Sequence, residues 1–217
     1  MNGLLKNDFY ACLGNGKIIA ALLLALGAGL CVSGNETLLG ALLLLSATAL
    51  SSAYVAPLRR EGKWARYLLT LPVRRRQIAF SHYAGFLASA LCGTALAVAF
   101  TGATVLLHGN LYFYPGLRDF WSMTAFGFCG CLLMGACFFP LHYALGAERS
   151  DAALLISLAA AVGLIAAYSL LANALSEPDH MSDLRFYALI ALFAVLAALA
   201  FGGSFLLSAR LLERKEY

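Results

Sequence analysis

Charged residues are scarce in this sequence: Lys, Arg, Asp and Glu together make up 12% of its 217 residues, whereas hydrophobic residues make up 62%. A soluble domain carries about twice that charged share, so the composition indicates a membrane protein. No Asp, Glu, Lys or Arg falls in the central part of any long apolar run. Proton- or sodium-coupled transporters usually need such a group inside the membrane, so this absence argues against ion-coupled transport.

The common catalytic and metal-binding motifs are also absent. The sequence has no G-x-x-x-x-G-K-[ST] loop, no G-x-S-x-G and no H-E-x-x-H, so we expect this chain neither to hydrolyse nucleotide nor to act as a hydrolase. Cys129 and Cys131 are two positions apart and would point to opposite sides of a helix, which disfavours a shared metal. We therefore predict no catalytic, cofactor or metal site, and any directional transport must draw its energy from a partner.

Six apolar stretches are predicted as transmembrane helices, because about 20 helical residues cross the roughly 30 Å hydrocarbon core of a bilayer. They cover residues 18–34, 38–56, 83–107, 120–145, 152–173 and 186–209. The first is short enough to be a signal-peptide core, but no small-x-small cleavage site follows it, and a helical hairpin with the second is preferred. We expect residues 1–217 to form a single all-α integral membrane domain.

The distribution of basic residues predicts the orientation. If both termini are cytoplasmic, thirteen Lys and Arg residues lie on the inner side and only Arg118 and Arg185 lie on the outer side. This asymmetry follows the positive-inside rule. The net charge of +4 therefore reflects topology, and no basic stripe with interleaved aromatic residues indicates nucleic-acid binding.

Two further patterns concern helix packing. Residues 3–17 are amphipathic and predict a helix lying in the cytoplasmic membrane interface, with Gly14 and Gly16 allowing a bend before the first span; the alternative is an extension of that span. Small residues recur every fourth position in the third and fourth spans, which predicts close helix packing within the subunit or between subunits. These stripes are Gly85, Ser89, Gly93, Ala97 and Thr101, followed by Gly127, Cys131 and Gly135.

The segment between the second and third spans holds seven Lys and Arg residues in the eighteen positions 59–76. Trp64, Tyr67, Leu68 and Leu71 follow i, i+3, i+4, i+7 and form one apolar face of a short helix that Pro72 ends. A new helical stretch from about Val73 should lead into the third span. The loop either binds anionic lipid headgroups or docks into a cytoplasmic protein, and the residues alone favour neither.

The same segment carries a resemblance to a known family. The pattern Glu61-x-Lys63-Trp64-x-x-Tyr67-x-x-x-Leu71-Pro72-Val73-x-Arg75-Arg76-Gln77-Ile78, running on to Ser81 and Tyr83, resembles a signature of small six-span type 2 ABC exporter permeases of bacteria, which include the phenol-soluble modulin exporters. Residues 3–8, 139–146 and 204–216 are similar in place and character to other parts of that family. His82 and Ala144 depart from it, since the family usually has lysine at the first position and often a basic or bulkier residue at the second.

The resemblance implies a permease subunit in a bacterial plasma membrane, paired with a second copy or a paralogue over two cytoplasmic ATP-binding subunits. ATP and Mg²⁺ would bind to those partner subunits and not to this chain. The helix around 61–71 would be the coupling helix, with Trp64 and Tyr67 as anchors in a groove of the partner. The residues implied in this contact are Arg60, Glu61, Lys63, Trp64, Arg66, Tyr67, Leu68, Leu71, Pro72 and Arg75. Glu148 and Arg149 are a candidate second contact, although a plain solvated turn is slightly preferred there.

The function expected from these observations is ATP-driven export, with membrane-active peptides as a cargo class that suits uncharged span interiors. The main alternative is an immunity or stress protein that binds peptides in the membrane without any ATPase. An intramembrane enzyme is disfavoured, because no charged or nucleophile–base cluster occurs at a common depth.

Overall fold

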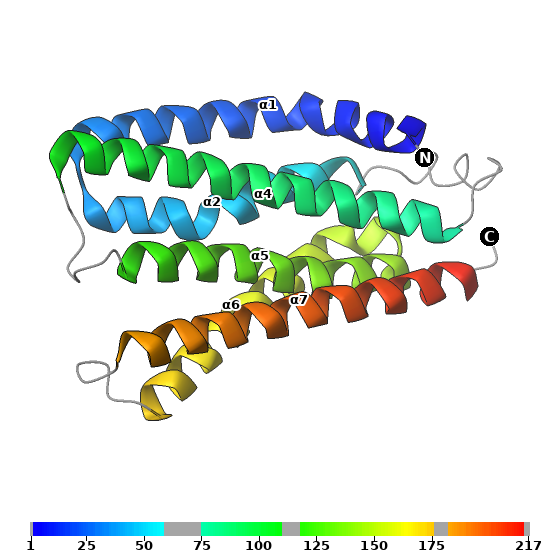
Figure 1. The fold of residues 1–217 in the computed structure, drawn as a ribbon. Helices are drawn as coiled ribbons and strands as arrows, with labels where there is room; N and C mark the ends of the chain where they lie inside the picture. Colours follow the sequence, from blue (N-terminus) through cyan, green and yellow to red (C-terminus); the bar gives the residue numbers. More distant parts are fainter. Residues whose placement is uncertain (1, 59–74, 110–117, 176–181, 215–217) are drawn as a thin grey trace.

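The computed structural model describes residues 2–58, 75–109, 118–175 and 182–214, and every regular element in these residues is helical. The elements are α1 (Asn2–Ser33), α2 (Glu36–Leu58), α4 (Arg75–His108), α5 (Arg118–Leu145), the single turn η1 (Ala147–Arg149), α6 (Ser150–Leu175) and α7 (Asp183–Arg214). Successive long helices run in opposite directions, so α1 begins and α7 ends at the same end of the bundle (Figure 1). We call this the inner end, because the charge asymmetry predicts that it faces the cytoplasm, and the opposite end the outer end.

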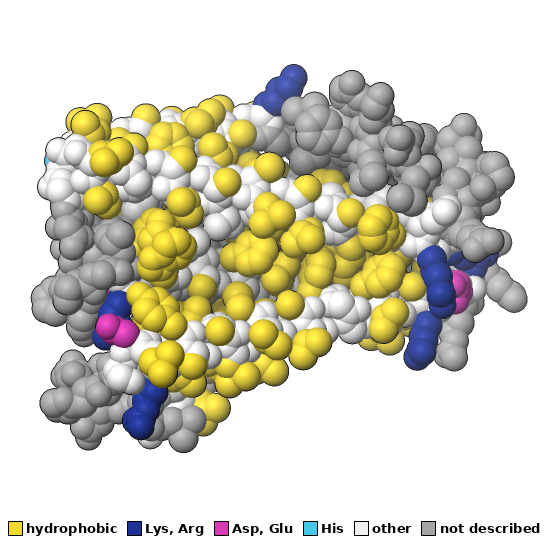
Figure 2. Space-filling view, in the orientation of Figure 1, with side chains coloured by type: hydrophobic (Ala, Val, Ile, Leu, Met, Phe, Trp, Pro, Cys, Tyr) yellow, Lys and Arg dark blue, Asp and Glu magenta, His cyan; other side chains and the backbone are white. Residues whose placement is uncertain are grey.

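Five of the helices are long and apolar enough to cross a membrane: α2, α4, α5, α6 and α7. The apolar part of α1, Lys17–Ser33, falls just below that length, so the sixth span remains a prediction. Apolar side chains cover a broad band on the face shown in Figure 2, and most of the visible charged side chains lie at the two ends. This distribution fits a bilayer around the middle of the bundle.

The N-terminal region differs from the prediction of a separate interfacial helix. The structure has one helix of 32 residues, Asn2–Ser33, which continues through Gly14 and Gly16 without a break. Each helical glycine costs roughly 1 kcal/mol relative to alanine, a cost that a continuous helix of this length tolerates. The alternative interpretation, an extension of the first span, is therefore the one that the backbone supports.

The helices α4 and α7 extend beyond the predicted spans at the inner end. Helix α4 begins at Arg75, ahead of the predicted span start at Tyr83, and has 34 residues. At 1.5 Å per residue it is about 51 Å long, well beyond the roughly 30 Å of hydrocarbon. The prediction of a helical stretch that leads directly into the third span is confirmed.

The turn between α1 and α2 shows why the second helix begins where it does. Gly34 has φ +61°, a conformation that favours glycine, and its amide donates to the carbonyl of Leu30 at 3.0 Å. Asn35 then caps α2, because its Oδ1 accepts from the amide of Leu38 at 3.3 Å. This turn joins α1 and α2 as neighbouring helices of a hairpin.

The two stripes of small residues lie inside the subunit. A Cβ on Gly93 would meet the Ser46 carbonyl oxygen of α2 at 2.6 Å, and a Cβ on Gly127 would meet the backbone of α2 at Leu43 and Leu44. Helix α2 is therefore packed backbone to backbone against both α4 and α5. Of the two possibilities that the sequence allowed, the stripes are used within one chain.

Helix α5 lies at the centre of the bundle and packs against α2, α4, α6 and α7. Its fully buried side chains include Phe138, Phe139 and Met134. By contrast, α6 and α7 expose many large apolar side chains, such as Leu170 and Leu199. Those surfaces suit contact with lipid or with another membrane-embedded chain.

Candidate functional site

Most of the predicted coupling residues lie outside the described residues. They are Arg60, Glu61, Lys63, Trp64, Arg66, Tyr67, Leu68, Leu71 and Pro72, all within 59–74. Arg75 is described and is the first residue of α4. The site can therefore be built from the inner end of the bundle, where α4 begins.

Arg75 joins the start of α4 to the end of α7. Its Nη1 donates to the carbonyl oxygens of Leu212 at 3.1 Å and of Glu213 at 2.9 Å. These carbonyls belong to the last turn of α7, where no following helical amide is available to them. A guanidinium is favourable there because the C-terminal end of a helix carries partial negative charge, and a hydrogen bond to a charged group contributes about 1.5–3 kcal/mol.

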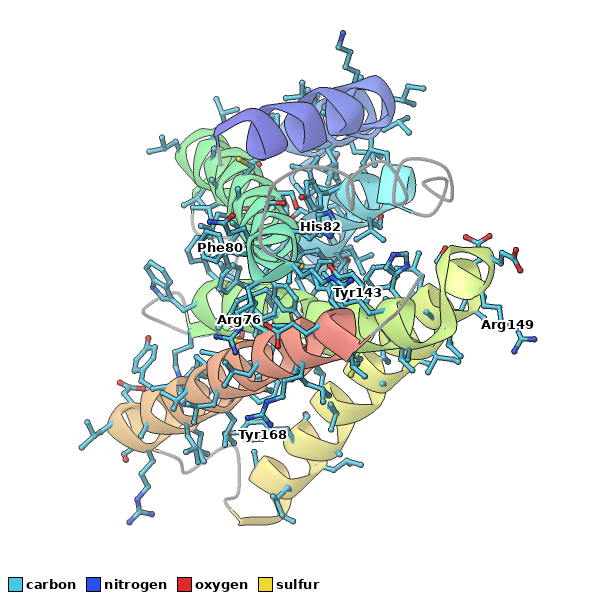
Figure 3. The ribbon with its side chains drawn as sticks, turned by 90° about the vertical axis from the view of Figure 1, so that its right-hand side faces the viewer. Arg76, Phe80, His82, Tyr143, Arg149 and Tyr168 are labelled. Carbon is cyan, nitrogen blue, oxygen red and sulfur yellow. The ribbon has the colours of Figure 1, made fainter. Side chains whose placement is uncertain are left out.

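Arg76 makes a second link between the same helix ends. Its Nε lies 2.9 Å from Oε1 of Glu213, with side-chain exposures of 68% and 45%. An ion pair this exposed contributes about 0–1 kcal/mol. Figure 3 looks onto the inner end and labels Arg76 there. Arg75 thus supplies most of the polar attachment, and Arg76 adds little.

Tyr83 forms a buried link one step deeper in the bundle. Its hydroxyl lies 2.7 Å from Oγ of Ser204 and 2.8 Å from Oγ of Ser208, both on α7. Its ring packs on Phe139 of α5, with 4.3 Å between the ring centroids, and on Phe201 of α7 at 5.0 Å. Helices α4, α5 and α7 therefore meet around one tyrosine.

Ser204 also compensates for a proline inside α5. Pro140 has no amide hydrogen, so the carbonyl of Ala136, four residues earlier, loses its normal helical donor. The Oγ of Ser204 donates to that carbonyl oxygen at 2.6 Å. Neighbouring hydroxyls commonly satisfy backbone groups that a proline frees in membrane helices.

His82 links α4 to α5 beside this cluster. Its Nδ1 lies 2.7 Å from the hydroxyl of Tyr143, and the two side chains face each other in Figure 3. The His82 residue is only 5% exposed. A neutral imidazole with a hydroxyl partner is tolerated in such a position, whereas the charge of a buried lysine would need a counter-charge. The departure from lysine at this position therefore suits its surroundings.

Three stretches that resemble the type 2 permease family come together at this end. They are the start of α4 (Arg75 to Tyr83), the end of α5 (139–146) and the end of α7 (204–213), which are far apart in the sequence. Sequence reasoning missed the Ser204 bond, although a proline within a predicted span is a signal that some carbonyl needs an outside donor.

The candidate second contact, Glu148 and Arg149, lies in η1 at the same end of the bundle, and both residues are exposed. In Figure 3 Arg149 points away from the bundle, at the opposite side of the view from Arg76. The structure thus places these two residues at the inner end without bringing them to Arg75. Among the described residues, no group of three or more His, Cys, Asp or Glu side chains lies close enough to hold a metal ion.

Comparison with known proteins identifies a family for the chain. The model of the family described as ABC-2 family transporter protein matches residues 3–213. No curated protein and no solved structure matches the chain. In this family a separate partner subunit hydrolyses ATP. Because the family match takes in nearly the whole chain, the protein belongs to the ABC-2 transporter family, as a membrane permease subunit.

Proposed function

We propose that the chain is the permease subunit of an ATP-driven exporter in a bacterial plasma membrane, with its inner end in the cytoplasm. The observation that carries the proposal is the family match over residues 3–213. The thirteen basic residues assigned to the inner side, against two on the outer side, support the orientation.

The coupling segment is proposed at 61–71. Its amphipathic pattern places Trp64 and Tyr67 on one face, with Glu61 and the basic residues around them. Three residues separate the segment from Arg75, which begins α4. A partner that moves this segment therefore acts directly on the end of a helix that runs the length of the bundle.

The proposed cargo is amphipathic or hydrophobic, with membrane-active peptides as the main class, as in the phenol-soluble modulin exporters that the sequence resembles. In α2, α4, α5, α6 and α7, every Asp, Glu, Lys and Arg lies within five residues of a helix end. A pathway through such helices offers no fixed charge to a small ion, whereas apolar cargo needs none.

A second permease copy or a paralogue is proposed as the other membrane partner. The glycine stripes of α4 and α5 are already packed within the chain, against α2 and, at Gly135, against side chains of α4 and α7, so they are not available to a second copy. The exposed apolar faces of α1, α6 and α7 are then the surfaces on which such a partner would pack.

Co-purification with a candidate ATP-binding subunit, encoded beside this protein, tests the proposal in mild detergent. We expect wild type to capture the subunit, and Trp64→Ala and Glu61→Ala to lose it, because buried aromatic and charged anchors dominate such contacts. Trp121→Ala is the matched control: Trp121 is the other tryptophan in the chain, is 53% exposed, and lies near the outer start of α5.

The result also separates the proposal from its main alternative. Capture by wild type and by Trp121→Ala, with loss in the two loop variants, would support ATP-driven transport through the 61–71 segment. A wild-type chain that captures no ATP-binding subunit, yet still protects cells against a membrane-active peptide, would favour the immunity protein instead.

A further inference from the structure

We propose that α7 is driven together with α4, so that a push on the segment before Arg75 moves the inner halves of both helices as one rigid body. This inference rests on the proposed function for the source of the push. It adds α7, which is distant in sequence from the coupling segment, to the helices that the push would move. We call the contacts that join the two helices the α4–α7 clamp: Arg75, Arg76 and Tyr83 on α4 with Ser204, Ser208, Leu212 and Glu213 on α7.

The first observation is where the clamp begins. The first residue of α4, Arg75, donates to two successive carbonyls of the last turn of α7. Any displacement of the start of α4 must therefore either pull the end of α7 along or break charge-assisted hydrogen bonds. The neighbouring ion pair between Arg76 and Glu213 joins the same two helix ends through a second side chain.

The second observation is that the attachment continues inward for several turns. The rings of Phe80 and Phe205 meet edge to face at 6.3 Å, and those of Phe86 and Phe201 stack at 6.1 Å. Between them, the Tyr83 hydroxyl holds two serines of α7. Contacts at the successive positions 75, 76, 80, 83 and 86 resist both sliding and separation of the two helices.

The third observation is that α7 also contacts α6 near the outer end. The hydroxyl of Tyr168 on α6 donates to the carbonyl oxygen of Leu189 on α7 at 2.6 Å, and the ring of Tyr168 stacks on Phe193 of α7 at 4.5 Å. A motion that reaches α7 at its inner half is thus passed to the outer half of α6. In this way the push reaches α6 and α7, both of which expose many large apolar side chains.

Distance measurement by pulsed electron paramagnetic resonance tests the inference on the full chain in lipid nanodiscs. Nitroxide labels are placed at Gln77 on α4 and Leu206 on α7, two exposed positions, in a background in which all six cysteines are replaced by Ala. The variant to compare is Arg75→Gln with Tyr83→Phe, which keeps both helices' apolar packing. Its matched control is Arg185→Gln with Tyr187→Phe, which removes one arginine and one hydroxyl at exposed positions of α7 outside the clamp.

In the chain alone, we expect one narrow distance distribution for the unmutated clamp and for the control, and a broadened one for the clamp variant. With the ATP-binding subunit and MgATP, we expect the distance to stay constant in the intact clamp and to change in the clamp variant. Thermal unfolding of all three chains shows whether each is folded.

The outcomes separate the clamp from the proposed function. A distribution as narrow in the clamp variant as in the control, or a distance that changes with nucleotide while the clamp is intact, would overturn the clamp and leave the exporter function standing. Failure of the intact chain to bind any ATP-binding subunit would overturn the function, and with it the role of the clamp in transmitting a push.

Discussion

Helices α2 and α7 are held in the bundle by opposite means. Helix α2 is in backbone contact with its neighbours at Gly93 and Gly127, whereas α7 is held to α4 and α5 by large aromatic rings and hydrogen-bonding side chains. Backbone contact depends on the absence of a side chain and tolerates no added atom. Hydrogen-bonded contact depends on particular groups, each of which can be removed while the shape is kept. The two interfaces should therefore respond differently to substitution.

The largest effect is expected from adding one methyl group to the α2 interface. In Gly93→Ala the new Cβ would lie 2.6 Å from the Ser46 carbonyl oxygen and 2.9 Å from Cα of Ala47, both backbone atoms that cannot rotate away. We expect α4 and α2 to separate, with a loss of about 3 kcal/mol or more in the free energy of unfolding, because neither backbone can give way. The measurement is unfolding in detergent or bilayer, followed by temperature or denaturant.

The matched control for that change lies on the same helix. Gly102 is exposed, and a Cβ added there would meet no other atom within 4 Å. Gly102→Ala should therefore be neutral or stabilise the helix by up to about 1 kcal/mol. Equal effects of the two substitutions on the free energy of unfolding would show that contact with α2 does not set the outcome at position 93.

A smaller but more specific effect is expected at the proline of α5. Ser204→Ala removes the donor to the Ala136 carbonyl and a partner of Tyr83, and should cost about 1–3 kcal/mol because a buried acceptor is left unpaired. In a Pro140→Ala background the restored amide serves that carbonyl, so the cost of Ser204→Ala should be reduced. A double-mutant cycle measures this coupling, and strictly additive effects would contradict the link between the two residues.

The smallest effect is expected at Arg76, on the exposed end of the α4–α7 contact, where two adjacent arginines should differ. Arg75→Gln loses charge-assisted bonds to two carbonyls and should cost about 1.5–3 kcal/mol, whereas Arg76→Gln loses one exposed ion pair and should cost about 0–1 kcal/mol. Salt should weaken the contribution of Arg76 in particular. Unfolding at low and high ionic strength compares them, and an equal cost for both would remove the distinction.

The sequence predicted much of the fold because hydrophobic run length is a strong signal in membrane proteins. The spans at 38–56, 120–145 and 152–173 lie within α2, α5 and α6. The prediction of a separate interfacial helix was wrong. It placed a bend at Gly14 and Gly16, which glycine permits, but the backbone of α1 is continuous there. Periodicity detects which residues share a face but does not show whether a helix continues past a permissive residue.

The site was less accessible to sequence reasoning. Arg75 was expected at a partner contact, and the structure shows it bonded to α7 within the chain, while nine other predicted coupling residues lie outside the described residues. The Ser204 bond depends on which turn of α7 lies beside Pro140. That register is set by tertiary packing, so no spacing in the sequence reveals it.

The bond between Ser204 and the Ala136 carbonyl has a consequence for how relatives of this protein should vary. The hydroxyl at position 204 is needed because Pro140 withholds an amide, so the two positions are linked although they are far apart in the sequence. A relative with any other residue at the proline position makes its own helical bond there, and its residue at the serine position is free to lose the hydroxyl. Aligned sequences should therefore show proline at the one position together with serine or threonine at the other.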